Sequence, residues 1–257
     1  MGMAISIDVH DDVAGWPGLD EVIAWLHHVD ATFSPYRLDS PISRLGLGEI
    51  TLDDVTAEVA DVLFTCERLR IDTGGAFDAF AVPAPNGSHL DPSGYVKGWA
   101  VQRAADLLEA AGLCDLCINA GGDIVVRGRP RPDPAWRIGL RSPSDPDSVA
   151  AVIEVTGDLA VATSATYERG AHIVDPRTGQ PAGSGLASLT VTGTELGMVD
   201  AYATAGFVLG DAGLDWIADQ PGLDGIAIGW DGGVRATAAW HDLARGEEHC
   251  EARGRQP

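Results

Sequence analysis

The chain has 257 residues, of which 45% are hydrophobic and 21% charged, and its 17 Lys and Arg against 38 Asp and Glu give a net charge of −21. This composition is typical of a globular protein that folds without disulfides or a structural metal, and it excludes a disordered or fibrous chain. The acidic balance excludes the basic footprint that nucleic-acid binding requires, and it disfavours anionic membrane surfaces as partners.

The sequence contains no run of about 18 apolar residues, the length that a membrane-spanning helix needs, so we expect no membrane insertion. Residues 1–12 lack the basic and apolar regions of a signal peptide. We therefore expect a cytoplasmic protein, with removal of a leader from the sequence as the alternative.

The first half of the chain predicts a strand followed by helices. Residues 1–9 alternate between apolar and polar side chains, as a half-buried strand does. Residues 17–33 carry apolar side chains at spacings of three and four, which predicts a helix that Ser34-Pro35 ends. Residues 51–70 predict a second helix, which begins with a Thr-x-x-Asp pattern that resembles a capping pair.

A Gly- and Pro-rich passage at 73–98 is too long for a simple connection and indicates a binding loop. It leads into a third helix, 99–111, which Gly112 closes. Strands then dominate. The expected strands are 116–119, 124–126, 136–140, 151–155, 159–162, 173–174 and 188–191.

Two short helices, 200–209 and 213–218, and a hairpin complete the chain. The hairpin joins strands 225–228 and 234–237 through an Asp-Gly-Gly turn. Blocks of strands separated by helices predict an α+β fold. We expect a single domain over residues 1–246 and a frayed polar tail over 247–257.

Four polar segments are candidates for a functional site. Residues 73–78 pair two glycines with Asp78, which favours close approach to a ligand, although a plain tight turn is the alternative. Residues 91–98 place Lys97 near the start of a helix, where phosphate binds well, although Lys97 can equally be a solvated surface residue. Residues 162–179 hold His172 among Ser, Thr, Asp and Arg, where a structural histidine is the alternative.

The fourth segment places Asp200 and Thr204 one helical turn apart. A carboxylate and a hydroxyl on one face form half of a hard-oxygen site that suits Mg²⁺. In the alternative interpretation, Asp200 caps the helix and Thr204 bonds back to a carbonyl. Because a chain of this charge repels polyphosphates, a polyphosphate site would need a metal at Asp200 and cations such as Lys97, Arg37 and Arg177.

Cys114 and Cys117 form a lone CxxC motif. A zinc site needs a second pair or histidines at ligand spacing, and neither is evident. Ordinary strand cysteines in a reduced protein are the better interpretation.

Several motifs resemble those of the ApbE family, the FAD:protein FMN transferases, in the family's order over roughly residues 1 to 230. The segments that carry the resemblance are 30–45, 73–78, 91–100, 119–124, 162–179 and 200–204. The resemblance implies two T-fold-like subdomains with FAD in a cleft between them. It also implies a Mg²⁺-dependent transferase that cleaves FAD, releases AMP and leaves FMN as a phosphoester on a Thr or Ser of a flavin-accepting electron-transfer protein.

The resemblance also implies roles for individual residues. It implies metal ligation by Asp200, Thr204 and the backbone carbonyl of Val96, and catalysis by His172. The implied FAD contacts are Met1, Tyr36, Ala76, Phe77, Asp78, Ser93, Lys97, Trp99 and Ile173. The chain departs from the family pattern at Val96, often Ala, and at Asp91-Pro-Ser-Gly, commonly Asp-Leu-Gly-Gly. Its link between Arg169 and His172 is also shorter than in many members.

Three other functions stay open on the sequence. An FAD pyrophosphatase would use the same residues with water as the nucleophile, giving free FMN and AMP. A non-catalytic FAD-binding module would retain FAD without turnover. A thiol-redox role for Cys114 and Cys117 is the least favoured.

Overall fold

A seven-stranded antiparallel sheet forms the centre of the computed structural model, which describes residues 2–12, 15–81, 83–145, 147–166, 173–182, 185–238 and 240. Its spatial order is β1, β2, β3, β6, β9, β10, β11. The strands are β1 (Ile5–Val9), β2 (Leu116–Ala120), β3 (Asp123–Arg127), β6 (Leu159–Ala165), β9 (Leu186–Gly193), β10 (Asp224–Gly229) and β11 (Val234–Ala236). The strands stand in chain order across the sheet, although other elements intervene in the chain between β1 and β2, between β3 and β6, between β6 and β9, and between β9 and β10.

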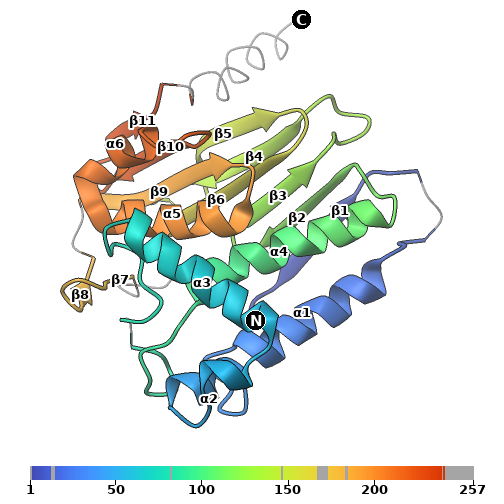
Figure 1. Cartoon of the computed structure of the whole chain (residues 1–257). Helices are drawn as coiled ribbons and strands as arrows, with labels where there is room; N and C mark the ends of the chain where they lie inside the picture. Colours follow the sequence, from blue (N-terminus) through green and yellow to red (C-terminus); the bar gives the residue numbers. More distant parts are fainter. Residues whose placement is uncertain are drawn as a thin grey trace, which may run out of the picture.

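Helices cover one face of this sheet, and the larger hydrophobic core lies between the two layers (Figure 1). The helices are α1 (Leu19–Phe33), α2 (Pro41–Gly46), α3 (Ala57–Asp72), α4 (Ser93–Ala110), α5 (Leu196–Leu209) and α6 (Gly213–Ala218), with short 3-10 helices η1 (Leu52–Asp54) and η2 (Gly210–Ala212). Helix α5 is central, since ten of its 14 residues are buried. A helix that is apolar around most of its circumference is stable only when other elements surround it.

The opposite face of the sheet is covered by the hairpin of β4 (Trp136–Arg141) and β5 (Val149–Val155). Burial alternates strictly along β4, so Trp136, Ile138 and Leu140 point towards the sheet. They form a second, smaller core with residues of β3, β6 and β10. A small ladder of β7 (Val174–Asp175) and β8 (Gln180–Pro181) lies apart from both sheets.

Helices α4 and α5 meet at two glycines. A Cβ added at Gly98 would lie 2.5 Å from the backbone oxygen of Leu196, and one at Gly197 would lie 2.8 Å from the Tyr95 ring. No side chain therefore fits between the helices at this crossing. The contact brings Lys97 of α4 beside Asp200 of α5.

Most of the predicted elements are confirmed, and so is the α+β class. The strand over 5–9 has the expected half-buried face, the closing hairpin pairs as predicted, and Gly112 follows α4 with a φ of 95°. The division into two subdomains and the single-domain span of 1–246 stay predictions. Residues 247–257 lie outside the described residues.

The predicted helix over 51–70 is wrong as a single element. Thr51 and Asp54 do form a capping box, but they cap only the 3-10 turn η1. The chain is extended at Val55, and Thr56 then caps α3 by accepting a hydrogen bond from the Val59 N–H at 3.4 Å. Two competing caps five residues apart divide the segment.

Helices α4 and α5 both begin earlier than expected, at Ser93 rather than 99 and at Leu196 rather than 200. Their first two turns contain Gly94, Gly98 and Gly197, and glycine has low helix propensity. Packing between the two helices stabilises these turns despite that propensity. Within the described residues, no helix is long and apolar enough to cross a membrane.

Candidate functional site

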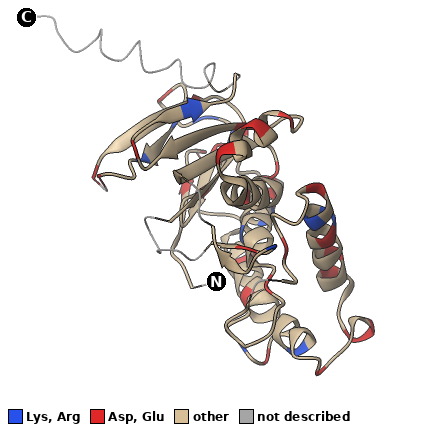
Figure 2. Ribbon diagram, turned by 90° about the vertical axis from the view of Figure 1, so that its left-hand side faces the viewer, with Lys and Arg blue, Asp and Glu red and all other residues tan. Residues whose placement is uncertain are grey.

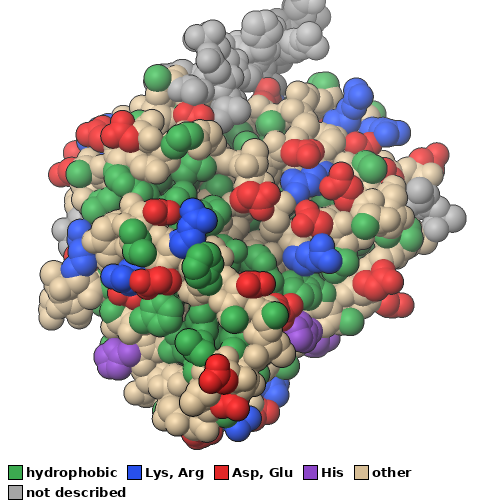
Figure 3. Space-filling model, in the orientation of Figure 1, with side chains coloured by type: hydrophobic (Ala, Val, Ile, Leu, Met, Phe, Trp, Pro, Cys, Tyr) green, Lys and Arg blue, Asp and Glu red, His purple; other side chains and the backbone are tan. Residues whose placement is uncertain are grey.

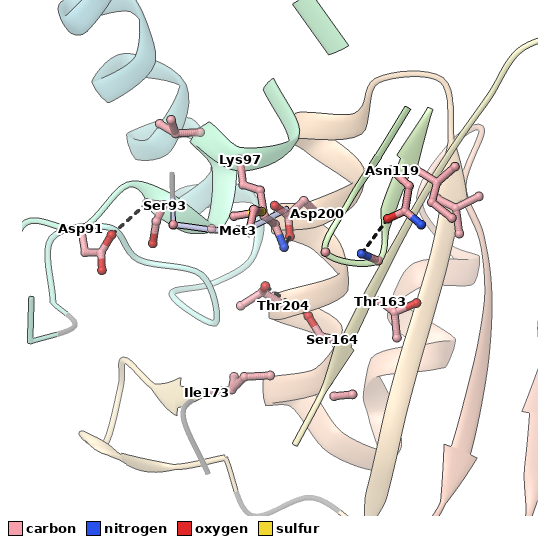
Figure 4. Close-up of a pocket in the computed structure, with 18 of the residues that line it drawn as sticks. Met3, Asp91, Ser93, Lys97, Asn119, Thr163, Ser164, Ile173, Asp200 and Thr204 are labelled. Atoms are coloured by element: carbon pink, nitrogen blue, oxygen red, sulfur yellow. Dashed lines mark hydrogen bonds and ion pairs between the residues drawn. The ribbon is translucent and has the colours of Figure 1, made fainter. Parts of the chain in front are cut away.

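A cleft of about 1880 Å³ is lined by helices, by strands of the large sheet and by β4. Its walls come from residues 2–6, the end of α1, the loop after it, the first turn of α4, the β2–β3 turn, β4, β6, β9 and α5. Figure 4 shows side chains of α4, α5, β2 and β6 around this space. All four polar segments identified in the sequence contribute to this one cleft.

Most of the expected site residues line the cleft. They are Tyr36, Ala76, Phe77, Asp78, Ser93, Val96, Lys97, Ile173, Asp200 and Thr204. Met1 and His172 lie outside the described residues, although the chain neighbour of His172, Ile173, lines the wall. Tyr36 is 80% exposed at the mouth of the cleft.

Trp99, another of the expected FAD contacts, is not among the residues that line the cleft. Its ring packs edge-on against Trp25 and Phe33 of α1, with centroids 5.0 and 5.4 Å away. The reason is helical geometry, because two residues along a helix turn the side chain to nearly the opposite side from Lys97. Trp99 joins α4 to α1.

The polar centre of the cleft is a cluster of one ammonium and two carboxyl groups. The Lys97 Nζ lies 2.6 Å from Asp123 Oδ2 and 3.7 Å from Asp200 Oδ1. Asp123, at the start of β3, is 1% exposed and Asp200 is 5% exposed. Two buried acids against one base leave the cluster one positive charge short.

The pKa values of both acids are raised, as this shortage of positive charge predicts. Burial, followed by repulsion from Asp123, raises the pKa of Asp200 well above its usual range. Burial also raises the pKa of Asp123, although Lys97 opposes the shift. Within the described part of the chain, Asp200 Oδ2 and Asp123 Oδ2 are both buried without a hydrogen-bond partner, and of these two atoms Asp123 Oδ2 has the Lys97 ammonium 2.6 Å away. Since a buried carboxylate oxygen is costly to leave unpaired, a cation bound at Asp200 Oδ2 would relieve the shortage.

Asp200 does not cap its helix, because α5 begins at Leu196 and Glu195 occupies the cap position. Thr204 follows one turn later, and its Oγ1 lies 3.2 Å from the Ser164 Oγ of β6. Both side chains face the cleft in Figure 4, and Val96 lines it from α4. The described residues include no cluster of three or more His, Cys, Asp or Glu that could hold a metal. A metal here would therefore draw on hydroxyl and carbonyl oxygens besides Asp200, as Mg²⁺ does.

The loops around the cluster are fixed by local hydrogen bonds. Thr73 Oγ1 accepts from the Phe77 N–H at 3.0 Å, and this bond closes the turn in which Gly74 and Gly75 have φ of 59° and 82°. Asp91 Oδ1 accepts a hydrogen bond from the Ser93 N–H at 2.9 Å and so gives the first N–H group of α4 a partner. Backbone here is held in place before any ligand arrives.

Of the predicted cations, Arg37 lines the cleft and pairs with Asp39 at 3.1 Å. Arg177 is not among the lining residues and makes two 2.9 Å hydrogen bonds to Asp175. Asp123 was missed by reasoning from the residues. The only signal for it was the 119–124 motif, where the Asn119 side chain accepts from the Gly122 N–H at 3.0 Å and so shapes the turn before Asp123.

Asp and Glu residues are distributed over helices and connecting segments rather than gathered on one element (Figure 2). On the helical face they are interspersed with Lys and Arg (Figure 3). The net charge of −21 repels an anionic ligand at long range. Positive charge within the cleft must overcome this repulsion.

Replacement of Cys114 and Cys117 by Ser is expected to leave ligand binding in the cleft and the activity of the protein unchanged. Burial raises the pKa of the Cys117 thiol to about 11, so this sulfur is a thiol and not a reactive thiolate at neutral pH. Neither cysteine lines the cleft. Equal activity of the double variant and the unmodified protein would confirm the expectation, and a loss of activity would give the pair a role.

Comparisons with known proteins agree on one family. The profile of the ApbE family matches residues 1–87 and 82–227. The FAD:protein FMN transferase of Rhodobacter capsulatus is 32% identical over 225 residues, which are 84% of this chain and 39% of the relative. That of Vibrio cholerae is 36% identical over 132 residues, which are 48% of this chain and 39% of the relative. The matches thus span well under half the length of these two relatives.

Solved structures give the same result. The flavin transferase ApbE from Vibrio cholerae superposes with a TM-score of 0.81 and 26% identity, over 95% of this chain and 96% of the other. The apbe protein of Thermotoga maritima, at 22% identity and a TM-score of 0.79, supports the fold alone. On the family profile and these likenesses together, the chain is a member of the ApbE family.

Proposed function

We propose that this protein is a Mg²⁺-dependent transferase that moves FMN from FAD to a Thr or Ser of an acceptor protein and releases AMP. The observation that carries the proposal is the buried Asp200–Asp123–Lys97 cluster, one cation short, at the centre of the large cleft. Curated relatives bear the name of this activity.

The dimensions of the cleft support a ligand larger than a common metabolite. Ordinary small-molecule pockets have volumes of about 300–1,000 Å³, and this cleft has about 1880 Å³. That space suits a dinucleotide together with an acceptor segment. An 80% exposed tyrosine at the mouth, Tyr36, offers a flat surface to a flavin ring.

Asp200, Thr204 and the backbone carbonyl of Val96 would hold the Mg²⁺. When bound, the ion would offset negative charge on the FAD pyrophosphate. Lys97 would add a point charge beside the phosphates, and the first turn of α4 at Ser93 would offer backbone N–H groups. Phosphoryl transfer depends mainly on such positioning and charge neutralisation.

The remaining FAD contacts in the proposal are Met1, Ala76, Phe77, Asp78 and Ile173. Trp99 would act only by fixing α4 against α1. In the reaction, the acceptor hydroxyl oxygen bonds to the FMN phosphorus, and the bond from that phosphorus to the bridging oxygen breaks. AMP leaves with the bridging oxygen, and His172 would take the hydroxyl proton as general base.

His172→Ala is expected to bind FAD normally but to transfer FMN at least about 100-fold more slowly, the lower end of general-base contributions. FAD binding is measured by fluorescence titration, and transfer by in-gel flavin fluorescence of the acceptor. Transfer at the unmodified rate would remove His172 from the mechanism.

The test of the function itself combines the purified protein, FAD, Mg²⁺ and a flavin-accepting domain of an electron-transfer protein. Covalent flavin fluorescence on the denatured acceptor with an equal amount of AMP is the expected result. AMP with free FMN and no labelled acceptor would instead indicate a pyrophosphatase. FAD that stays bound without AMP release would indicate a binding module.

A further inference from the structure

Lys97 lies beside two buried acids, of which only Asp200 is a proposed metal ligand. Lys97 reaches both buried acids, and its ammonium lies closer to Asp123, at 2.6 Å, than to Asp200, at 3.7 Å. Each acid is on a different element, Asp123 at the start of β3 and Asp200 on α5. The acid that lies closer to Lys97 is therefore not the one that the proposed metal site uses.

A lysine and a divalent cation are competitors for the same carboxylate. If the Lys97 ammonium moved the short distance to Asp200, it would neutralise the oxygen that a cation needs. Asp123 offers the ammonium the closer partner. Asp123 is itself fixed in place, since it follows a turn that the Asn119 side chain closes and lies on a strand inside the sheet.

We infer that Asp123 is a positioning residue that holds the Lys97 ammonium away from Asp200 and so keeps Asp200 open to a divalent cation. This inference rests on the proposed metal site. Asp123 then acts through Lys97 and is not itself a ligand.

Asp123→Asn is the direct test, because the amide keeps the shape of the carboxyl group and removes its charge. We expect the affinity for Mn²⁺, measured by electron paramagnetic resonance without FAD, to fall at least about tenfold, a coupling usual for charged groups in contact. Lys97→Met, at a side chain that is 24% exposed, is expected to bind Mn²⁺ at least as tightly as the unmodified protein.

The double variant Asp123→Asn/Lys97→Met distinguishes positioning from simple attraction. With no ammonium left to move onto Asp200, most of the lost affinity is expected to return. If Asp123 were a ligand or only a distant negative charge, its removal would cost the same with or without Lys97. That additive outcome would overturn the inference, as would weaker Mn²⁺ binding by Lys97→Met alone.

Asp115→Asn is the matched control. Asp115 is also a buried acid with a 2.6 Å ion pair, to Arg131, but it does not line the cleft. We expect this variant to keep its Mn²⁺ affinity. Absence of Mn²⁺ binding by the unmodified protein would refute the proposed metal site itself, whereas unchanged binding by Asp123→Asn would refute only the role of Asp123.

Discussion

Asp200→Ala is expected to lower both AMP release and FMN transfer at least about 10³-fold. A metal supplies several kcal/mol of charge stabilisation in such reactions, and each 1.36 kcal/mol is a factor of ten in rate. The variant removes the only carboxylate among the proposed ligands, so higher Mg²⁺ concentrations are not expected to restore the rate.

The same variant should not lose stability when metal is absent. Removing Asp200 ends its repulsion with Asp123 and leaves Lys97 paired with one acid, so a melting temperature in EDTA equal to or above that of the unmodified protein is expected. Asp211→Ala is the control, at a side chain that is 87% exposed just beyond α5. Full Mg²⁺-dependent activity of Asp200→Ala would exclude the metal assignment.

Gly98→Val is expected to reduce the free energy of unfolding by about 3 kcal/mol, the upper part of the range for overpacking. A Cβ at this position would lie 2.5 Å from the Leu196 oxygen and 2.9 Å from the Gly197 Cα, and backbone atoms have little freedom to yield. Helices α4 and α5 would separate, and Lys97 would move away from Asp200. Mn²⁺ affinity should therefore fall together with stability.

Urea unfolding followed by circular dichroism measures the change. Ala110→Val, at an exposed position near the end of α4, separates the intrinsic helix penalty of valine from the packing effect. Gly98→Ala tests the same crossing with a smaller side chain. In a helix without neighbours this exchange increases stability, so a decrease in the free energy of unfolding would show the cost of the close contact. A stabilising effect of Gly98→Ala would show that the helix crossing can open without cost.

Local patterns predicted the elements whose signals do not depend on distant residues. The alternation in 5–9 and the turn at 231–233 both produced the expected structures. Helix α2 was missed although Ser40 caps it and Pro41 stands in its first turn, because six residues are too few to show a period. The early starts of α4 and α5 depend on contacts between helices about 100 residues apart in the sequence.

The residues of the site also differ in whether a local pattern predicts them. The helical spacing of Asp200 and Thr204 placed both on one face of one helix, and the structure has them so. The contact of Lys97 with Asp123 joins a helix to a strand and has no periodicity to reveal it. The expected FAD contact of Trp99 came from the family resemblance, whereas its ring packs against Trp25 and Phe33 of α1.

The position of the edge strand β1 has a practical consequence for protein production. Residues 2–6 line the cleft while β1 completes the sheet beside β2. Because residues 2–6 form part of the cleft wall, we expect an affinity tag attached to the N-terminus to weaken ligand binding, and comparison of tagged with untagged protein measures the effect. Purification handles placed at the other end of the chain, or cleaved off completely, avoid this interference.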